Sequence, residues 1–269
     1  MSQIGGSTVL VTGGASGIGY LTGRKLLAKG AQRLVIWDIQ KAALERVAAE
    51  LTGEGYQVDG YQVDIADPAR VEATVQEMDA AGIAVDLLVN NAGIIVGKPF
   101  IDHTPADIGR TMDVNALAPM YLTHALLPGM VARGRGHVVN ISSAASMVSN
   151  PRMSVYCASK WALTGWSDSL RLEMERACTG VRVTTVTTYY IDTGMFAGVR
   201  SPLIPILEPE RVTDDIVAAI ERDRIFLRLP HVVNFLPLLR GILPLRWFDR
   251  IAGDWLGIYD TMTGFRGRT

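Results

Sequence analysis

Tyr156 and Lys160 lie four residues apart, and Ser143 precedes Tyr156 by 13 residues. Positions i and i+4 of a helix share a face, so the phenol and the ammonium would point the same way. A neighbouring ammonium favours the phenolate, so we expect it to lower the Tyr156 pKa from about 10. Tyr156 could then move a proton to or from an alcohol oxygen held by the Ser143 hydroxyl. Taken alone, Tyr156 and Lys160 could equally be a chance pair on a surface helix. The strands and helices expected around them are needed to choose between these two interpretations.

A glycine-rich turn, TGGASGIG, follows the apolar run Thr8–Thr12 and precedes the helix-length stretch Ile18–Lys29. Glycines there permit a tight turn and a close approach of a pyrophosphate, and the helix N-terminus offers free N–H groups. The alternative is a tight connection without a ligand. The position between a strand and a helix favours a dinucleotide site.

Asp38 ends the second apolar run, RLVIWD, 19 residues after Gly19. A carboxylate at this place hydrogen-bonds the adenosine ribose 2′-OH and repels a 2′-phosphate. Its neighbours Trp37 and Ile39 bring no positive charge, so the sequence predicts NAD rather than NADP. The alternative is an Asp that only caps the following helix. Asp64, at the end of the third run, is expected near the adenine for the same strand-end reason.

Short apolar runs alternate with longer amphipathic stretches, which predicts βαβ units and a parallel sheet covered on both faces. We therefore predict an α/β fold with a doubly wound parallel sheet (Rossmann fold) of about seven strands. The predicted catalytic domain spans residues 1–229 and includes a substrate loop at 188–209. Residues 230–269 would form an apolar extension. The expected strands are Thr8–Thr12, Arg33–Asp38, Gln57–Asp64, Asp86–Asn90, His137–Ile141, Val181–Thr187 and Ile225–Leu229. The expected helices are Ile18–Lys29, Ala42–Leu51, Ala69–Ala80, Asp113–Arg133, Val155–Arg176 and Glu210–Arg222.

The composition narrows the function classes. The chain has 269 residues, a net charge of -1 and 48% hydrophobic residues, which gives no sign of a nucleic-acid surface. Two cysteines without a C-x-x-C pair fit a reducing compartment. The N-terminus shows no basic signal-peptide region, so we expect a cytoplasmic protein. We predict no metal site.

In order and approximate spacing, the chain resembles the short-chain dehydrogenase/reductase family, in its compact single-domain branch. The residues that carry the likeness are TGGASGIG, Asp38, Asp64, the NNAG at 90–93, Asn115 in DVNALAP, Ser143 and YCASK. The resemblance implies a catalytic tetrad in which Tyr156 is the acid/base and Ser143 positions the substrate oxygen. Lys160 would lower the Tyr156 pKa and bind the nicotinamide ribose, and Asn115 would help to hold a water for proton relay. From the sequence alone, Asn115 could equally start a helix or serve packing.

The same resemblance assigns the ligand-binding residues. The predicted NAD-binding residues are Gly13, Ser16, Gly17, Ile18, Gly19, Asp38, Asp64, Ile65, Asn91, Ala92, Gly93, Tyr156, Lys160, Ile191 and Thr193. The predicted substrate-binding residues are Ser143, Ala145, Tyr156, Tyr189 and Tyr190.

One stretch departs from the family pattern. The family usually has Pro-Gly after the sixth strand, where this chain has Thr188 and Tyr189, and a Thr four residues further on, where this chain has Thr193. The loss of Gly removes easy access to positive φ. The departure leaves the path of this loop open, and Tyr189 is expected near the nicotinamide or the substrate.

A narrower likeness appears in IDTGMF, PILEPERV and LGIYDTMTGFRGR. These segments are similar to retinol dehydrogenases and lipid-acting 17β-hydroxysteroid dehydrogenases. The resemblance implies a lipophilic secondary alcohol or ketone as substrate, a homotetramer or dimer, and a role in lipid metabolism. Two alternatives stay open: an isomerase or dehydratase with NAD as an internal redox cofactor, and a non-catalytic dinucleotide-sensing, lipid-binding scaffold.

Residues Ile225–Trp255 are rich in Leu, Ile, Phe and Trp, with Arg240, Arg246 and Arg250 among them. Basic residues beside Trp and Leu fit a segment that lies in a membrane interface. The alternative is packing on the domain or on another subunit, with the Arg stems covering apolar surface.

Overall fold

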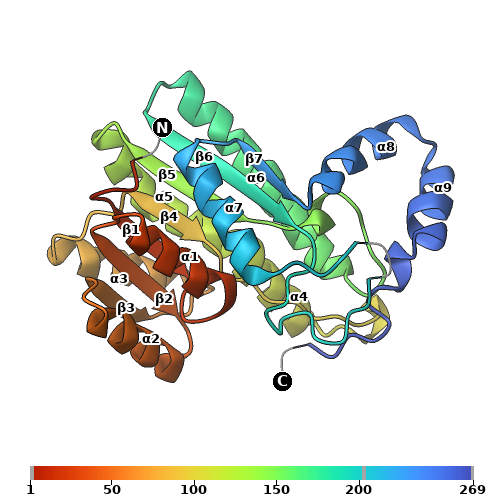
Figure 1. The fold of residues 1–269 in the computed structure, drawn as a ribbon, viewed down its shortest axis with the longest axis horizontal. Helices are drawn as coiled ribbons and strands as arrows, with labels where there is room; N and C mark the ends of the chain where they lie inside the picture. The colour runs from red at the N-terminus through yellow and green to blue at the C-terminus, as the bar shows by residue number, and fades with distance from the viewer. Residues whose placement is uncertain (1–2, 202–203, 268–269) are drawn as a thin grey trace.

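The computed structural model describes residues 3–201 and 204–267. A parallel sheet of seven strands forms the centre, in the order β3-β2-β1-β4-β5-β6-β7 (Figure 1). The strand order reverses between β1 and β4, which is the mark of a doubly wound sheet, so the predicted fold class is confirmed. The strands are β1 (Thr8–Thr12), β2 (Arg33–Asp38), β3 (Val58–Gln62), β4 (Leu87–Asn90), β5 (Gly136–Ile141), β6 (Val181–Thr188) and β7 (Phe226–Leu229).

Helices cover both faces of this sheet. One hydrophobic core joins the strands to α1 (Gly17–Ala28), α2 (Lys41–Gly53) and α7 (Pro209–Glu221). A second core joins the opposite face to α3 (Pro68–Ala80), α5 (Ala118–Ala132) and α6 (Ser154–Arg176). Neighbouring residues of one strand enter different cores, as Val9 and Leu10 do, because strand side chains alternate between faces. This two-sided burial explains why the strands read as continuous apolar runs.

The segment before α5 differs from the expected single helix. A helix that the sequence analysis missed, α4 (Pro105–Met112), comes first. It runs into a π-helical segment, Asp113–Leu117, and only then into α5. The start of α4 has a capping box, in which the Thr104 side chain accepts from the Asp107 backbone N–H and the Asp107 carboxylate accepts from the Thr104 N–H. The sequence TPAD therefore contained a helix-start signal.

The C-terminal extension follows β7 as short helical segments. These are a 3₁₀ segment His231–Phe235, α8 (Leu236–Ile242), α9 (Leu245–Phe248), a π-helical segment Asp249–Trp255 and a 3₁₀ segment Ile258–Asp260. Figure 1 shows α8 and α9 projecting beside the main body of the protein. Within residues 3–201 and 204–267, no helix has the length and apolarity needed to cross a membrane.

Buried His137 makes the stability of the fold pH-dependent. His137 is a residue of β5, and its Nε2 lies 2.8 Å from Thr184 Oγ1. Burial, together with the charge of Arg182, outweighs the opposing effect of Asp223 and lowers the His137 pKa to about 4. Between pH 6.5 and 4 the unfolded chain therefore binds a proton that the folded protein excludes. The free energy of unfolding should fall by about 3 kcal/mol over this range on account of this group.

Urea denaturation at several pH values between 7.5 and 4.5 measures this effect. His137→Gln should flatten the pH dependence relative to the unmodified protein. His231→Gln, at an exposed histidine of the extension, is the matched control and should leave the pH dependence as it was. Parallel pH curves for the unmodified protein and His137→Gln would contradict the assignment.

Candidate active site

A long cavity of about 850 Å³ lies at the carboxyl edge of the sheet. It extends from the glycine turn after β1 to Tyr156 and Lys160 on α6 and to the C-terminal residues 265–267. The predicted residues that line it are Gly13, Ser16, Gly17, Ile18, Asp38, Asp64, Ile65, Asn91, Ala92, Gly93, Ser143, Tyr156, Lys160, Tyr189, Ile191 and Thr193. Four predicted residues do not line it: Gly19, Asn115, Ala145 and Tyr190.

The glycine turn has the backbone geometry that its sequence requires. Gly13 and Gly17 have φ of 62° and 56°, values that side chains rarely allow. Gly19 lies beneath the turn, where a Cβ would overlap the Asn91 amide and the Gly13 carbonyl. Gly19 is therefore required for packing under the cofactor loop, and the ligand would contact its neighbours at the start of α1.

Thr12, which the sequence analysis did not single out, joins the turn to the loop after β4. Its hydroxyl accepts from the backbone N–H groups of Asn91 and Ala92, at 3.0 and 3.1 Å. The Asn91 amide in turn donates to the carbonyls of Thr12 and Gly13, at 2.8 and 3.2 Å. A polar residue at the end of an otherwise apolar strand was the available signal.

The Asp38 carboxylate lies in the wall of the cavity and is 9% exposed. One oxygen accepts from the Ala15 backbone N–H in the glycine turn, at 3.1 Å, and the other from Gln40 N–H, at 2.9 Å. Gln40 is the N-cap residue of α2, so Asp38 supports the start of this helix. Its contact with a ribose stays a prediction. The carboxylate orients the turn and the helix start while it faces the cavity.

Asp64 and Ile65 also line the cavity, after β3. The Asp64 carboxylate accepts from Ala66 N–H at 3.1 Å and from the Arg110 guanidinium at 2.9 Å. Burial acts to raise the Asp64 pKa, but the hydrogen bonds from Arg110 and Ala66 outweigh burial and the pKa is lowered. Arg110 was not predicted, because α4, which carries it, was missed.

These features fit a dinucleotide. The cavity is elongated, its glycine turn opens onto a helix N-terminus, and its acidic residues lie at the ends of neighbouring strands. A ribose hydroxyl could donate to Asp38, and a pyrophosphate could lie against the turn and the first N–H groups of α1.

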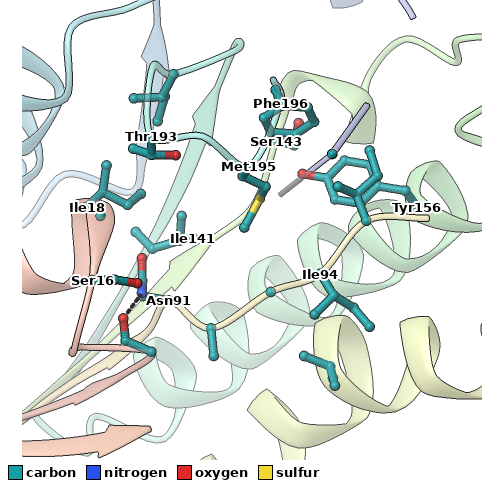
Figure 2. A pocket seen from close by; sticks show the side chains of 18 of the residues that line it. Ser16, Ile18, Asn91, Ile94, Ile141, Ser143, Tyr156, Thr193, Met195 and Phe196 are labelled. Carbon is teal, nitrogen blue, oxygen red and sulfur yellow. Dashed lines mark hydrogen bonds between the residues drawn. The ribbon is translucent and has the colours of Figure 1, made fainter. Parts of the chain in front are cut away.

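Ser143, Tyr156 and Lys160 line the other end of the cavity, and Figure 2 shows the first two. Ser143 follows β5, and the other two lie on one face of α6, 5% and 4% exposed. Lys160 Nζ donates to the Ile141 carbonyl at 2.9 Å and lies 5.8 Å from the centre of the Tyr156 ring. The structure therefore brings together the predicted acid/base, its basic neighbour and the substrate-positioning hydroxyl.

The pKa of Tyr156 differs from our expectation. Burial raises it to about 12, and a hydrogen bond with the Ser143 side chain offsets only part of that effect. Burial also lowers the pKa of Lys160 to about 8. The expectation that Lys160 lowers the Tyr156 pKa is thus not met in this structure, because removal of both groups from water disfavours their charged forms.

Asn115 is fully buried in the π-helical segment. Its side-chain oxygen accepts from Ile94 N–H at 2.8 Å, and its amide nitrogen donates to Ile94 O at 2.8 Å and Ser159 Oγ at 3.0 Å. The amide therefore fixes the loop after β4 against α6. Its role in holding a water stays a prediction.

At the start of the loop after β6, Tyr189 stands where the family pattern has glycine. Tyr189 has no positive φ, and its N–H donates to Leu229 O at 2.8 Å, which continues the pairing of β6 with β7. Thr193 lies beside Gly17, and both line the cavity; Figure 2 shows Thr193 near Ile18. The predicted substrate loop 188–209 is described except for residues 202 and 203, which lie outside the described part.

The wall around Ser143 and Tyr156 is largely apolar, although Lys98 and Arg266 also line the cavity. Ala145 and Tyr190 pack behind Tyr156 and do not face the cavity, so they are not in the position expected of substrate-binding residues. Lining residues that the sequence analysis missed are Ile94, Met195, Phe196 and Phe265 (Figure 2 labels the first three). They come from loops and from the C-terminus, where no periodic pattern indicates which side chains face inward.

Residues 7–203 match the family model described as short chain dehydrogenase. The chain belongs to this family. It is 35% identical over 268 residues to human epidermal retinol dehydrogenase 2, covering 98% of this chain and 86% of that protein. It is 35% identical over 265 residues to estradiol 17-beta-dehydrogenase 11 of Macaca fascicularis, covering 98% of this chain and 88% of that protein.

Among solved structures, a metagenomic short-chain oxidoreductase in complex with NADP is 31% identical, with a TM-score of 0.70. The alignment covers 84% of this chain and 96% of that chain. The protein is thus an oxidoreductase of the short-chain dehydrogenase family, with retinol and steroid dehydrogenases among its relatives.

Proposed function

We propose that the protein is an NAD(H)-dependent oxidoreductase that interconverts a lipophilic secondary alcohol and its ketone. The observation that carries this proposal is the single cavity that joins Asp38 to Ser143 and Tyr156, with an apolar wall at the second end. The hydroxyls of Ser143 and Tyr156 beside apolar side chains suit an alcohol whose remaining surface is apolar.

The catalytic residues would divide the work as follows. Ser143 donates a hydrogen bond to the substrate oxygen and orients it. In oxidation Tyr156 takes the proton from the alcohol O–H, and in reduction it returns a proton to the carbonyl oxygen. When bound, NAD supplies the hydride acceptor for the carbinol hydrogen. Lys160, held by Ile141 O, would bind the nicotinamide ribose and keep a positive charge behind Tyr156.

Asp38 favours NAD in this proposal. The metagenomic relative binds NADP, so family membership alone leaves the coenzyme open. Asp38 faces the cavity at the position where a 2′-phosphate would bring two further negative charges. Its neighbours in the sequence, Trp37 and Ile39, carry no positive charge that could bind such a phosphate.

The substrate class rests on the relatives and on the apolar wall. The relatives are a retinol dehydrogenase and an estradiol dehydrogenase by name, and the wall offers Ile94, Met195, Phe196 and Phe265. A steroid, a retinoid, a long-chain hydroxy fatty acid or a bulky aryl alcohol would fit this chemistry. A screen of these alcohols with NAD, read as NADH absorbance, tests the proposal. Binding of NADH without turnover of any alcohol would instead indicate a non-catalytic scaffold.

The exposed part of the extension supports a second proposal, that the protein contacts an anionic lipid surface. We call α8, α9 and the segment Asp249–Trp255 the apolar arm. Its inner side is fixed to the domain, because Phe248 packs on Val148 and Arg240 donates to Met147 O at 2.6 Å. Its outer side exposes Trp247 and Trp255, at 58% and 78%.

Charge argues for lipid as the occupant of this outer side. Arg246 and Arg250 are exposed among the arm's apolar side chains, and Trp with Arg is the composition of segments that lie at the boundary of headgroups and acyl chains. Each basic residue near an anionic surface contributes about 1 kcal/mol to binding.

Sedimentation with phosphatidylcholine vesicles, with and without phosphatidylserine, measures this contact. Trp247→Ser combined with Trp255→Ser should reduce the bound fraction at least about tenfold. Trp166→Phe, at a partly buried residue of the main core, is the control and should bind vesicles normally. The dimer or tetramer implied by the family resemblance stays a prediction, and size exclusion of the same variants measures it. A variant pair that changes the oligomer mass but not vesicle binding would show that a second copy covers the arm.

A further inference from the structure

Three segments that are distant in the sequence meet in one buried hydrogen-bonded group. The Asn150 side-chain nitrogen donates to Thr261 Oγ1 at 2.8 Å and to Tyr190 Oη at 3.3 Å. The Tyr190 and Thr261 hydroxyls lie 3.0 Å apart, and these two residues are 7% and 1% exposed. We call this group the Asn150–Tyr190–Thr261 node.

The node connects the catalytic loops to the C-terminus. Asn150 lies between Ser143 and Tyr156, and Tyr190 begins the loop after β6. Thr261 belongs to residues 258–267, which we call the C-terminal strap. The same nitrogen lies 3.1 Å from the carbonyl of Ile258, so its two hydrogens are shared among three acceptors. Ile258 O also accepts from Thr261 Oγ1 at 2.9 Å.

From this anchor the strap crosses the substrate end of the cavity. The Phe265 ring lies against Gly97, where a Cβ would overlap the ring. The Arg266 N–H donates to Ala197 O at 2.9 Å, and Thr261 O accepts from Arg200 N–H at 3.2 Å. Residues 265–267 line the cavity. The strap is therefore part of the wall that encloses a substrate.

The node is also connected to Tyr156, through the ring of Phe196. Tyr190 packs edge-on against Phe196, with ring centres 5.0 Å apart. Phe196 packs edge-on against Tyr156, with ring centres 6.1 Å apart. A shift of Tyr190 would therefore move the aromatic side chain that faces the substrate beside the phenol.

We propose that Asn150, Tyr190 and Thr261 are positioning residues that hold the strap closed over the substrate end, and that the closed strap selects bulky apolar alcohols. The selectivity part rests on the proposed function. None of the three side chains faces the cavity, so they act through Phe196 and Phe265. A short alcohol that reaches only Ser143 and Tyr156 gains nothing from the strap, whereas a long one is enclosed by it.

Two near-isosteric variants, Thr261→Val and Tyr190→Phe, each remove one hydroxyl of the node. Each should raise the KM of a ten-carbon secondary alcohol about tenfold, as expected for loss of one buried hydrogen bond. The KM and kcat for 2-butanol should change less than about twofold, because a short alcohol is not enclosed by the strap. The double variant should lose less than the sum of the two single variants, since both lose the bond between Tyr190 and Thr261.

Matched controls separate this effect from general destabilisation. Thr261→Ser keeps the hydroxyl and should restore the unmodified KM. Thr263→Val removes another hydroxyl of the strap, which is exposed and donates to Asp260 O, and should change nothing. Additive losses in the double variant, or an unchanged ratio of long-chain to short-chain KM in folded variants, would overturn the proposal.

Hydrogen–deuterium exchange tests strap closure without any substrate. Backbone amides of residues 258–267 should exchange at least about tenfold faster in Thr261→Val than in the unmodified protein or in Thr263→Val. Equal exchange rates would show that the node does not hold the strap. Faster exchange without turnover of any alcohol would keep the closure and refute only the proposed function.

Discussion

Tyr156→Phe should reduce turnover by about two to four orders of magnitude, the usual loss for a missing general acid/base. The substitution keeps the ring, which is packed against Phe196, and removes only the hydroxyl. Folding and NADH affinity should therefore change little. Steady-state kinetics with a lipophilic secondary alcohol, together with an NADH titration, measure both quantities.

The pH dependence provides a second test of the same residue. Because the Tyr156 pKa is raised to about 12, little of the phenol is in the base form at pH 7. The oxidation rate should then rise with pH, by up to about tenfold per unit, up to about pH 8, where Lys160 begins to lose its charge. In Tyr156→Phe the residual rate should lose this dependence. Retention of more than about a tenth of the turnover would mean that another group moves the proton.

Asp38→Ala with Ile39→Arg should increase the preference for NADP relative to NAD by about a hundredfold, or about 2.7 kcal/mol. The change removes a carboxylate that would repel a 2′-phosphate and adds a guanidinium that can bind it. The ratio of kcat/KM for the two coenzymes is the measured quantity.

Asp38→Asn is the control, because Asp38 also accepts from the Ala15 and Gln40 N–H groups. Asn loses the charge and keeps one accepting oxygen, while its NH2 group can no longer accept from the second N–H. It should show a smaller shift in the same direction. Equal use of NAD and NADP by the unmodified protein would refute the role given to Asp38.

The sheet and the cofactor end could be predicted because their residues obey local rules. The buried interior of a parallel strand is apolar, as in the LVIW of RLVIWD, and all such strands end at one edge. The turn needs glycine where φ is positive, at Gly13 and Gly17. Asp38 could be placed from its distance to the turn alone.

The arrangement of side chains at the substrate end could not be predicted, because it is set by contacts between segments that are distant in the sequence. Tyr190 was expected to touch substrate, but its hydroxyl bonds Thr261, 71 positions later in the chain. The sequence also did not show that the Asn115 amide bonds Ile94 and Ser159, and its role in holding a water stays a prediction. No local pattern predicts such partners. The raised pKa of Tyr156 likewise follows from burial, which the Tyr-Lys spacing does not determine.

Transfer of deuterium from a labelled alcohol tests the central claim most directly. A secondary alcohol deuterated at the carbinol carbon is incubated with NAD and the protein, and the coenzyme product is analysed by mass spectrometry. The account predicts NADH that carries one deuterium per ketone formed, and almost none of either product with Tyr156→Phe. Consumption of the alcohol without net NADH, as an isomerase or dehydratase would cause, would contradict it.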